Sequence, residues 1–488
     1  MDALSFIVLT GHFGLLAILC LYGGHRLYLT LLAQLTDRRT PAPGRLDVLP
    51  VVTVQLPVYN EKHVVRRLID AVAGLRYPAD RLHVQVLDDS TDETSALAAR
   101  RVAHHRRRGL DIEHVRRGDR SGFKAGALAA GLAHARGEII AVFDADFLPP
   151  PDFLQRTVHY FSDPAIGMVQ ARWQHLNRRA SALTRVQAML LDAHFAVEQV
   201  VRSHTGRFFN FNGTAGLWRA RAIRDAGGWH ADTLTEDLDL SYRAQLAGWR
   251  LLYLSDVGCP GELPPHMNAF KSQQHRWAKG AIQVMKKLLP RIWAAPISLR
   301  NKLDASFHLS NNLCYPLMFV DATIFLLPSI VVRDLYGGHP SLWLDLSLYG
   351  LASATHLYFF LAGQRLLLRN LRETLVTLPA LMATVVGLGF NNSRAVGEAL
   401  SGKVGEFVRT PKLGRGRHPA RRDSYFGAVR DWHRIELVLA GLFAIYFVWA
   451  VAEAHWSVAP FMLLFAAGFL LAGAPGSGRR LPSPPVDG

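Results

Sequence analysis

Residues 139–146 read Ile-Ile-Ala-Val-Phe-Asp-Ala-Asp, a short apolar run that ends in two carboxylates. Short runs rich in β-branched residues also occur at 51–56 and 82–87, and each of the three runs is followed by polar turn residues and then by helical periodicity. Short runs rich in β-branched residues that alternate with helices are typical of an open, mainly parallel α/β sheet. We therefore predict such a sheet for the central part of the chain, residues 50–290.

Polar residues follow each of these three runs. Pro-Val-Tyr-Asn-Glu occupies 57–61, Asp-Asp-Ser-Thr-Asp occupies 88–92, and Asp-Ala-Asp occupies 144–146. Open α/β sheets bind ligands at the carboxyl ends of their strands. A single Asp at such a place, for example Asp92 or Asp152, is more often a turn former or a helix N-cap. Three polar strand ends in succession predict a ligand site instead.

The residue types in this region suit a ligand with a diphosphate. A divalent cation held by Asp146 and by phosphate oxygens would stabilise the negative charge on a departing nucleotide, and oxygen ligands favour Mg²⁺ or Mn²⁺. Asp88 or Asp89 can accept hydrogen bonds from a base or a ribose. Lys124, at a predicted helix start, can bind phosphate together with free backbone N–H groups. The same position also suits an ordinary exposed lysine.

A second pair of motifs lies further along the chain. Thr-Glu-Asp occupies 235–237, where an extended segment turns into a helix, and Gln-Gln-His-Arg-Trp occupies 273–277 on the next helical stretch. A carboxylate base beside an amide, a guanidinium and a flat aromatic ring suits an enzyme that holds a sugar and deprotonates its hydroxyl group. In the alternative interpretation, Asp237 and Asp239 only cap the helix, and Trp277 anchors the chain at a membrane interface.

The composition indicates a membrane protein with more than one structural unit. The chain has 488 residues, half of them hydrophobic, and a mean hydropathy of +0.11. The formal net charge is +16, and Arg clusters flank the apolar stretches, as expected beside a bilayer. No nucleic-acid module signature is present, so we expect no nucleic-acid partner. Cys20, Cys259 and Cys314 lack the spacing of a zinc site or a disulfide framework.

Apolar stretches on both sides of the central part are long enough to cross a bilayer, which takes about 20 residues. We predict spans at 5–35, 313–332, 342–362, 435–452 and 458–471. The first lacks the features of a cleaved signal peptide. Residues 374–390 have basic residues on both sides and are predicted to be interfacial or re-entrant. Five spans place the N-terminus outside and the central part in the cytoplasm.

The predicted units follow from these boundaries. They are 1–40, an N-terminal span with a juxtamembrane segment; 50–290, the cytosolic α/β part; 291–476, a membrane part of about four spans and the interfacial helix; and 477–488, a cytosolic tail. The frequent use of alanine and arginine is typical of a bacterial protein. We therefore expect an integral protein of a bacterial inner membrane, with the α/β part in the cytoplasm.

Several motifs resemble family 2 glycosyltransferases of the GT-A fold, over residues 51–289 and beyond. Four motifs are most similar to the cellulose synthase-like A branch (mannan and glucomannan synthases) and its bacterial relatives. They are Phe-Asn-Phe-Asn-Gly-Thr-Ala-Gly-Leu-Trp-Arg at 209–219, Gly-Gly-Trp at 227–229, Gly-Glu-Leu-Pro at 261–264, and Gln-Gln-His-Arg-Trp at 273–277. Residues 404–416, with Glu-Phe-Val-Arg-Thr-Pro-Lys-Leu-Gly at 406–414, are similar to the cytosolic gating loop of cellulose synthases. Arg409 and Pro411 depart from that loop's usual pattern. Phe147 stands where cellulose synthases often have a His after Asp-x-Asp, so no metal ligand is expected there.

The resemblance implies a role for each matching residue. Asp237 would be the general base, Asp146 the metal ligand, and Trp277 the platform for the acceptor sugar. Pro57, Tyr59, Glu61, Asp88, Asp89, Lys124 and Asp144 would bind the nucleotide sugar; Asn212, Gly213, Glu236, Gln273 and Arg276 would complete the acceptor site; and Thr410 and Lys412 would bind phosphate from the gating loop.

We therefore expect an inverting, metal-dependent glycosyltransferase that extends a β-linked mannan, glucomannan or β-glucan processively. The donor would be UDP-glucose or GDP-mannose. A close alternative is the transfer of one sugar to a lipid acceptor. A non-catalytic membrane protein that only binds nucleotide sugar is a third possibility, and it would leave Asp237 and Gln273 without a function. A hydrolase with paired carboxylates would need neither a diphosphate site nor membrane spans.

Overall fold

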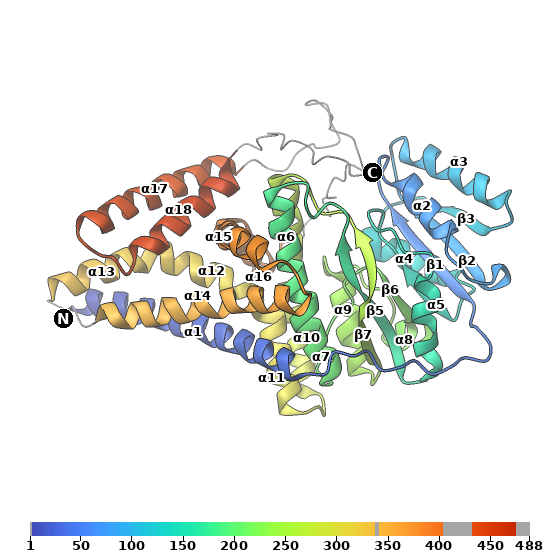
Figure 1. Cartoon of the computed structure of the whole chain (residues 1–488), viewed down its shortest axis with the longest axis horizontal. Helices are drawn as coiled ribbons and strands as arrows, with labels where there is room; N and C mark the ends of the chain where they lie inside the picture. Colours follow the sequence, from blue (N-terminus) through green and yellow to red (C-terminus); the bar gives the residue numbers. More distant parts are fainter. Residues whose placement is uncertain (1, 337–340, 404–431, 475–488) are drawn as a thin grey trace.

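The computed structural model describes residues 2–336, 341–403 and 432–474, except for the side chains of 341–346. The molecule is elongated, with a seven-stranded sheet and its helices at one end and a group of long helices at the other (Figure 1). The chain starts in the helical end and forms the whole sheet between residues 52 and 261. It then returns through α10, Met267–Ala294. An α/β unit inserted between apolar helices is therefore confirmed.

The sheet has the strand order β3-β2-β1-β4-β6-β5-β7. Its strands are β1 (Val52–Val58), β2 (Leu82–Asp88), β3 (Asp111–Arg116), β4 (Ile139–Val142), β5 (Ile166–His175), β6 (Gly216–Arg219) and β7 (Arg250–Gly261). Only β6 runs antiparallel to its neighbours β4 and β5; the other pairs are parallel. The three strands predicted from sequence are β1, β2 and β4, which lie side by side. Their polar carboxyl ends therefore meet at one edge of the sheet.

Shorter helices surround the sheet. They are α2 (Val65–Ala73), α3 (Thr94–Arg106), α4 (Phe123–Ala133), α5 (Phe153–Thr157), α6 (Ala182–Ala193), α7 (Val200–His204), α8 (Ala220–Asp225) and α9 (Glu236–Leu246), with the 3₁₀ turns η1 (Ala79–Arg81) and η2 (Val158–Ser162) and the π-helical stretch η3 (His194–Gln199). Alternate residues of each strand belong to opposite faces, as the strand period of two requires. Ile139 and Ala141 join one apolar cluster with Val54, whereas Ile140 and Val142 join another with Trp218.

The remaining helices are mostly apolar, except for the more polar α11 and α16. They are α1 (Ala3–Leu35), α11 (Leu299–Ser310), η4 (Asn311–Leu313), α12 (Cys314–Val320), the π-helical η5 (Asp321–Phe325), α13 (Leu326–Leu335), α14 (Ser341–Leu366), α15 (Leu371–Gly387), α16 (Gly389–Leu400), α17 (His433–Ala452) and α18 (Ala459–Gly473). Four described helical stretches are long and apolar enough to cross a membrane: 3–35, 299–335, 371–400 and 433–452. The apolar α18 is shorter, and α14 runs along α1.

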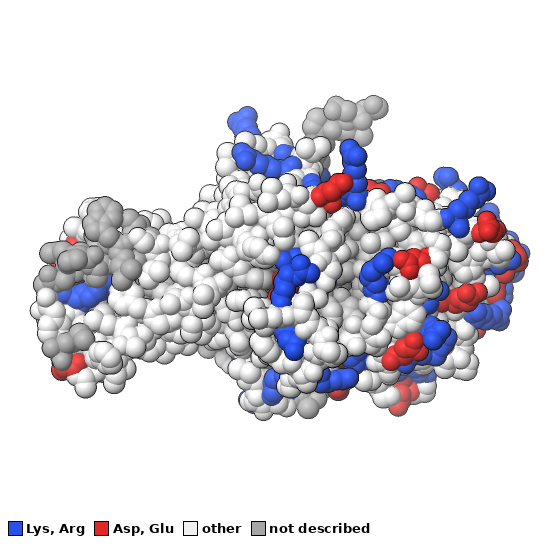
Figure 2. All heavy atoms as spheres, turned by 90° about the horizontal axis from the view of Figure 1, so that it is seen from below, with Lys and Arg blue, Asp and Glu red and all other residues white. Residues whose placement is uncertain are grey.

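The distribution of charge agrees with membrane integration. In Figure 2, Lys, Arg, Asp and Glu gather over the sheet-containing half, whereas the visible face of the helical half is almost free of them. Residues 371–400 differ from the other three apolar stretches, because half of the 18 residues in their most apolar part are buried inside the protein. The helix is interrupted at Leu388, and α15 packs on both α6 and α18. The predicted interfacial position of 374–390, and with it the five-span topology, remains a prediction.

Candidate active site

An open cleft lies at the carboxyl ends of β1 and β4. It brings together nearly all the described residues that the sequence predicted for the site. They are Pro57, Tyr59, Glu61, Asp89, Lys124, Asp144, Asp146, Asn212, Gly213, Glu236, Asp237, Gln273, Arg276 and Trp277. Segments up to 220 residues apart in sequence therefore form one site. Thr410 and Lys412, predicted for the gating loop, lie outside the described residues.

Lys124 stands at the centre of the charged residues. It lies in the first turn of α4, where Gly122 and Phe123 both have positive φ angles and turn the chain into the helix. Its Nζ is 2.7 Å from Asp144 and 3.5 Å from Glu236, and it donates a hydrogen bond of 2.9 Å to the Gly213 carbonyl. Burial disfavours the charged amine, but the carboxylates outweigh burial and hold the pKa of Lys124 above its ordinary value. The lysine is therefore a fixed cation rather than an exposed side chain.

Asp237 lies in the first turn of α9, against the chain at Gly213. Its Oδ1 accepts a hydrogen bond of 2.8 Å from the Leu238 backbone N–H. Burial, followed by the neighbouring Glu236 carboxylate, raises the pKa of Asp237 to about 7, although Lys124 acts in the opposite direction. A carboxylate with a pKa near neutrality can both accept and release a proton under ordinary conditions. The pKa of Asp237 thus reflects its burial and the adjacent like charge of Glu236.

The donor set fits a divalent cation. Among the carboxylates that line the cleft, Asp144, Asp146, Glu236 and Asp237 surround the cations of Lys124 and Arg276 most directly in their electrostatics. Burial raises the pKa of Asp144, Lys124 lowers it, and Asp146 raises it again. An additional cation beside these oxygen atoms would relieve the remaining repulsion, and carboxylates are the ligands that Mg²⁺ and Mn²⁺ prefer. Phe147, next to Asp146, packs edge-on against Trp173 and supplies no ligand.

Helix α10 carries the second motif. Gln273, Arg276 and Trp277 are spaced i, i+3 and i+4, so they lie on one face of the helix, and all three line the cleft. The helix approaches the start of α9 closely at Gly280, where a Cβ would lie 2.5 Å from the Thr235 side chain. On its other side α10 packs on α16, where Lys279 forms an ion pair of 3.0 Å with Glu398. The glycine therefore fixes the distance between the two motifs.

Two predicted nucleotide ligands differ in their surroundings. Asp88 is buried at the end of β2, where it accepts hydrogen bonds of 2.9 Å from the Ser90 N–H and 2.8 Å from His114. Burial opposes ionisation, but these bonds hold the pKa of Asp88 at about 2. Asp89 lines the cleft and pairs with the Arg117 guanidinium through both of its oxygen atoms, at 2.9 and 2.5 Å. Of the two alternatives, Asp89 is the one that a ligand in the cleft can reach.

Several residues of the cleft were not predicted from the sequence. Trp173 and His175 come from the end of β5, and Arg120 stacks on the Tyr59 ring with its Cζ 3.4 Å from the ring centroid. The run 166–175 alternates less clearly than the three strands that were predicted. A fourth polar strand end, Gln-His at 174–175, was the available signal. It was missed because β5 itself was not predicted.

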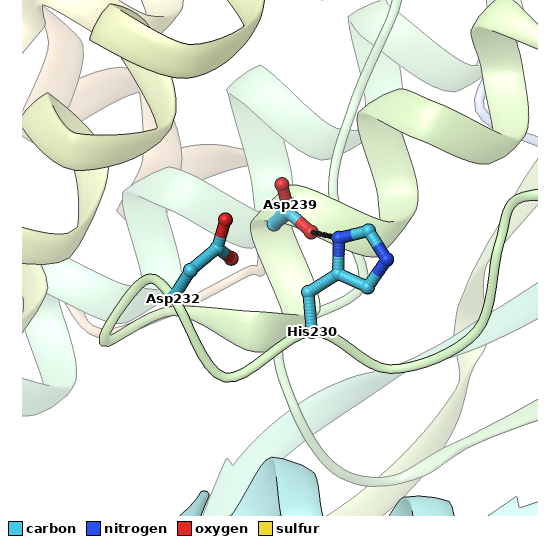
Figure 3. Close-up of side chains that lie close together, drawn as sticks. All are labelled: His230, Asp232 and Asp239. Carbon is cyan, nitrogen blue, oxygen red and sulfur yellow. Dashed lines mark ion pairs between the residues drawn. The ribbon is translucent and has the colours of Figure 1, made fainter.

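A group of His and Asp side chains outside the cleft has the composition of a metal site. Figure 3 shows His230, Asp232 and Asp239, whose ligand atoms lie within 4.8 Å of one another. However, Lys287 Nζ lies 3.1 Å from His230, 2.8 Å from Asp232 and 2.9 Å from Asp239. Arg243 also pairs with Asp239, at 2.7 Å. Two side-chain cations already balance these carboxylates, so the group is an ion-pair network at the α9–α10 contact.

Comparison with known proteins gives a consistent result. Residues 50–280 match the model of a family described as "Glycosyltransferase like family 2". Glucomannan 4-β-mannosyltransferase 1 of Oryza sativa is 36% identical over 82% of this chain and 77% of its own length. Glucomannan 4-β-mannosyltransferase 2 of Arabidopsis thaliana is 39% identical over 75% of this chain and 68% of its own length. Glucomannan 4-β-mannosyltransferase 1 of Cyamopsis tetragonoloba is 37% identical over 80% of this chain and 74% of its own length.

A solved structure has the same fold. The mannosyltransferase PcManGT from Pyrobaculum calidifontis, in complex with GDP-Man and Mn²⁺, aligns with a TM-score of 0.51 over 74% of this chain and 96% of its own. The two sequences are 22% identical, so the match supports the predicted GT-A fold and carries no argument about substrate.

Proposed function

Because this chain belongs to the glucomannan 4-β-mannosyltransferase branch of glycosyltransferase family 2, we propose that it transfers mannose from GDP-mannose to a growing β-1,4-linked mannan or glucomannan. The chain is a membrane-integrated glycosyltransferase. The observation that carries the proposal is the meeting of the two motifs. Asp237 and the face of α10 with Gln273, Arg276 and Trp277 line one cleft beside Asp144 and Asp146.

The chemistry is a direct displacement. The acceptor hydroxyl attacks the anomeric carbon of the donor while Asp237 takes its proton, and the bond to the diphosphate breaks on the opposite face. A donor with an α-linked diphosphate then gives a β-linked product. The raised pKa of Asp237, about 7, makes the conjugate acid easy to form. Lys124, held beside Asp144 and Glu236, contributes positive charge close to the diphosphate.

Asp146, together with Asp144, would hold the divalent cation, either Mg²⁺ or Mn²⁺. When bound, the cation would stabilise the charge that develops on the nucleoside diphosphate. Tyr59, Glu61 and Asp89, at the ends of β1 and β2, would bind the nucleoside, with Pro57 shaping that wall of the cleft. UDP-glucose is the alternative donor, and the named activity of the relatives favours GDP-mannose.

The acceptor side of the cleft would hold a chain after each addition. Trp277 would stack on the apolar face of the terminal sugar, while Gln273, Arg276 and Asn212 bind its hydroxyl groups and Gly213 and Glu236 complete the wall. Trp277 lies on α10, which leads directly into the apolar helices. The product would leave between these helices, and the nucleotide sugar would enter from the cytosol. Thr410 and Lys412 would bind phosphate during each cycle.

The membrane itself is part of the proposal. The expectation of a bacterial inner membrane came from composition, and the relatives named above are plant proteins that give it no support. What the helices and the charge distribution support is an integral membrane protein with its charged α/β part outside the bilayer. We propose that this part faces the compartment that supplies the nucleotide sugar.

The test is sugar incorporation by the purified protein in lipid nanodiscs. GDP-mannose and UDP-glucose, each radiolabelled, would be supplied in parallel with Mg²⁺ or Mn²⁺. We expect label from GDP-mannose in long material that an endo-β-mannanase digests, and no label after EDTA treatment. Label only in a solvent-extractable lipid would identify the single-sugar transferase instead. Label from UDP-glucose alone would overturn the donor assignment.

A further inference from the structure

The acceptor side of the cleft is connected to the membrane helices by a continuous line of polar side chains. It begins at Asn212, which lines the cleft, and passes through His194 and Glu198 of the π-helical stretch η3. It ends at Arg26 of α1, whose Nη2 lies 3.8 Å from Glu198 and donates a hydrogen bond of 3.2 Å to Asn311. π-Helical turns frequently occur at functional sites. The mechanism proposed above gives no role to His194 or Glu198.

Hydrogen bonds fix the orientation of the Asn212 amide at both ends. Gln199 Nε2 donates to the Asn210 carbonyl at 3.0 Å and to Asn212 Oδ1 at 2.6 Å. The backbone N–H of Asn212 donates to Gln170 at 2.9 Å. Asn212 Nδ2 lies 3.1 Å from His194 Nε2. Because an amide nitrogen can only donate, His194 Nε2 must be the acceptor.

This assignment determines the proton on His194. A neutral imidazole that accepts through Nε2 carries its hydrogen on Nδ1. His194 Nδ1 lies 2.7 Å from Glu198 Oε2, so it donates to that carboxylate. Burial opposes ionisation of Glu198, but the His194 bond and Arg26 hold its pKa below the ordinary value. The ionised carboxylate therefore selects the tautomer that the Asn212 amide requires.

With Gln199 Nε2 donating to the Asn210 carbonyl, one arrangement satisfies His194, Glu198 and Asn212 together. If His194 carried its hydrogen on Nε2, it would face the N–H groups of Asn212, and two donors would meet. Turning the amide over would relieve that clash, but it would then place the Asn212 nitrogen against the donating nitrogen of Gln199. In the arrangement observed, Oδ1 and one N–H of Asn212 are used within the described part of the chain. The second N–H is available to a ligand in the cleft.

We infer that His194 and Glu198 form a positioning pair that holds the Asn212 amide so that it binds a hydroxyl group of the acceptor sugar. The inference rests on the proposed function, and it concerns the acceptor rather than the donor for a geometric reason. Asn212 precedes Gly213, which packs against Asp237, the base for the acceptor hydroxyl. The polar line also runs towards α1, away from the nucleotide side of the cleft at β1 and β2.

Steady-state kinetics on the full-length protein in nanodiscs test the pair. The substrates are GDP-mannose and a β-1,4-mannohexaose acceptor. His194→Phe keeps the ring shape but offers no acceptor to Asn212, and it leaves Glu198 beside Arg26. We expect it to raise the KM for the acceptor about tenfold, the usual effect of losing one hydrogen bond in a buried site. The KM for GDP-mannose stays within about twofold of the wild-type value.

A double-mutant cycle separates positioning from a general loss of structure. Glu198→Ala alone raises the acceptor KM, and Glu198→Gln, which keeps an oxygen atom for His194 Nδ1–H, restores most of the wild-type value. Added to His194→Phe, Glu198→Ala changes the acceptor KM by less than about twofold, since both residues act through Asn212. Asp225→Ala, which removes an exposed i,i+4 pair with Arg221, is the matched control and changes neither KM.

The outcomes are distinct. Unchanged acceptor KM in His194→Phe, or effects that multiply in the double variant, would overturn the inference. Equal rises in the donor and acceptor KM would also overturn it. If the wild-type protein transferred mannose but bound no oligosaccharide, the inference would fail and the donor part of the proposed function would stand. If it transferred no sugar but bound mannohexaose more tightly than His194→Phe does, by calorimetry, the proposed function would fail and the positioning pair would stand.

Discussion

The Asp237 carboxylate packs against Gly213, at a place where any larger residue would collide with it. A Cβ on Gly213 would lie 2.9 Å from Asp237 Oδ2 and 3.3 Å from Lys124 Nζ, and the Gly213 carbonyl accepts the Lys124 hydrogen bond. The φ angle of Gly213 is +82°, a conformation that L side chains rarely adopt. One glycine thus sets the distance between the proposed base and the lysine of the diphosphate site.

Gly213→Ala is therefore expected to lower kcat by at least tenfold, because the new methyl group displaces the Asp237 carboxylate. The control is Gly228→Ala. Its φ angle is +83°, but nothing lies within 4 Å of the added Cβ. Both variants should lose about 1 kcal/mol of stability from backbone strain, measured by thermal unfolding in detergent. An equal loss of kcat in the two variants would show that strain, and not the contact with Asp237, is responsible.

Asp237→Asn is expected to lower kcat by about 10²–10⁴-fold, the usual contribution of a general base. It should also stabilise the protein at pH 7.5. The folded-state pKa of Asp237 is raised from 3.8 to about 7, so the folded protein binds more protons than the unfolded chain between these values. Its stability therefore falls as pH rises through that window. Removing the charge should give back roughly 1–2 kcal/mol at pH 7.5, after allowance for partial exposure.

The same gain should disappear near pH 4, where the native Asp237 is neutral and the unfolded carboxyl group is itself partly protonated. Thermal unfolding of wild type and Asp237→Asn across pH 4–8 measures this difference. Asp80→Asn, on an exposed turn, is the control and should show no such trend. A stability difference that is independent of pH would contradict the raised pKa.

Lys124→Met should raise the KM for the donor and shift the acid limb of kcat/KM to higher pH. The lysine lowers the pKa of Asp237 in the native protein, so its removal leaves burial and Glu236 less strongly opposed, chiefly by the Leu238 backbone hydrogen bond. The pH profile of sugar transfer measures the shift. Lys286→Met is the matched control, because that lysine binds the Ala399 and Leu400 carbonyls at the end of α16. An acid limb at an unchanged pH would show that Lys124 does not influence the pKa of Asp237.

If residues 374–390 do not cross the bilayer, the two ends of 371–400 lie on the same side. Single cysteines at Arg372 and Lys403, both exposed, report on this directly when the three native cysteines are replaced. We expect a membrane-impermeant maleimide to label both positions in inside-out vesicles and neither in right-side-out vesicles. Labelling of the two positions from opposite sides would show that α15 and α16 together cross the bilayer.

The sequence predicted which strand ends line the cleft, and the reason is physical. β1, β2 and β4 are buried on both faces, and each appears as a short run rich in β-branched and other apolar residues, followed by polar residues. Topology then brings their ends together, and Asp89 and Asp144 meet in one cleft with Asp237. The motif on α10 was equally clear, because i, i+3 and i+4 spacing places Gln273, Arg276 and Trp277 on one helix face.

Other parts depended on packing that spacing alone does not indicate. Asp88 and Asp89 have the same chemistry, and only the fold shows that His114 and Ser90 occupy the first while the second faces the cleft. Trp173 and His175 were missed because β5 mixes polar and apolar residues without a clear period. The connection from Asn212 through His194 to Glu198 requires a π-helical turn, which propensities do not predict.

Inverting transfer to a growing β-linked chain fixes the anomeric configuration of the product, which can be measured. Wild type and Asp237→Asn, reconstituted in nanodiscs with Mn²⁺, would receive GDP-[¹³C]mannose and β-1,4-mannohexaose. The product would be examined by the one-bond carbon–hydrogen coupling at its anomeric carbons and by its chain length. We predict β-linked mannose added in many successive units by the wild type and almost none by the variant. An α-linked product, or a product made equally well by Asp237→Asn, would contradict the account.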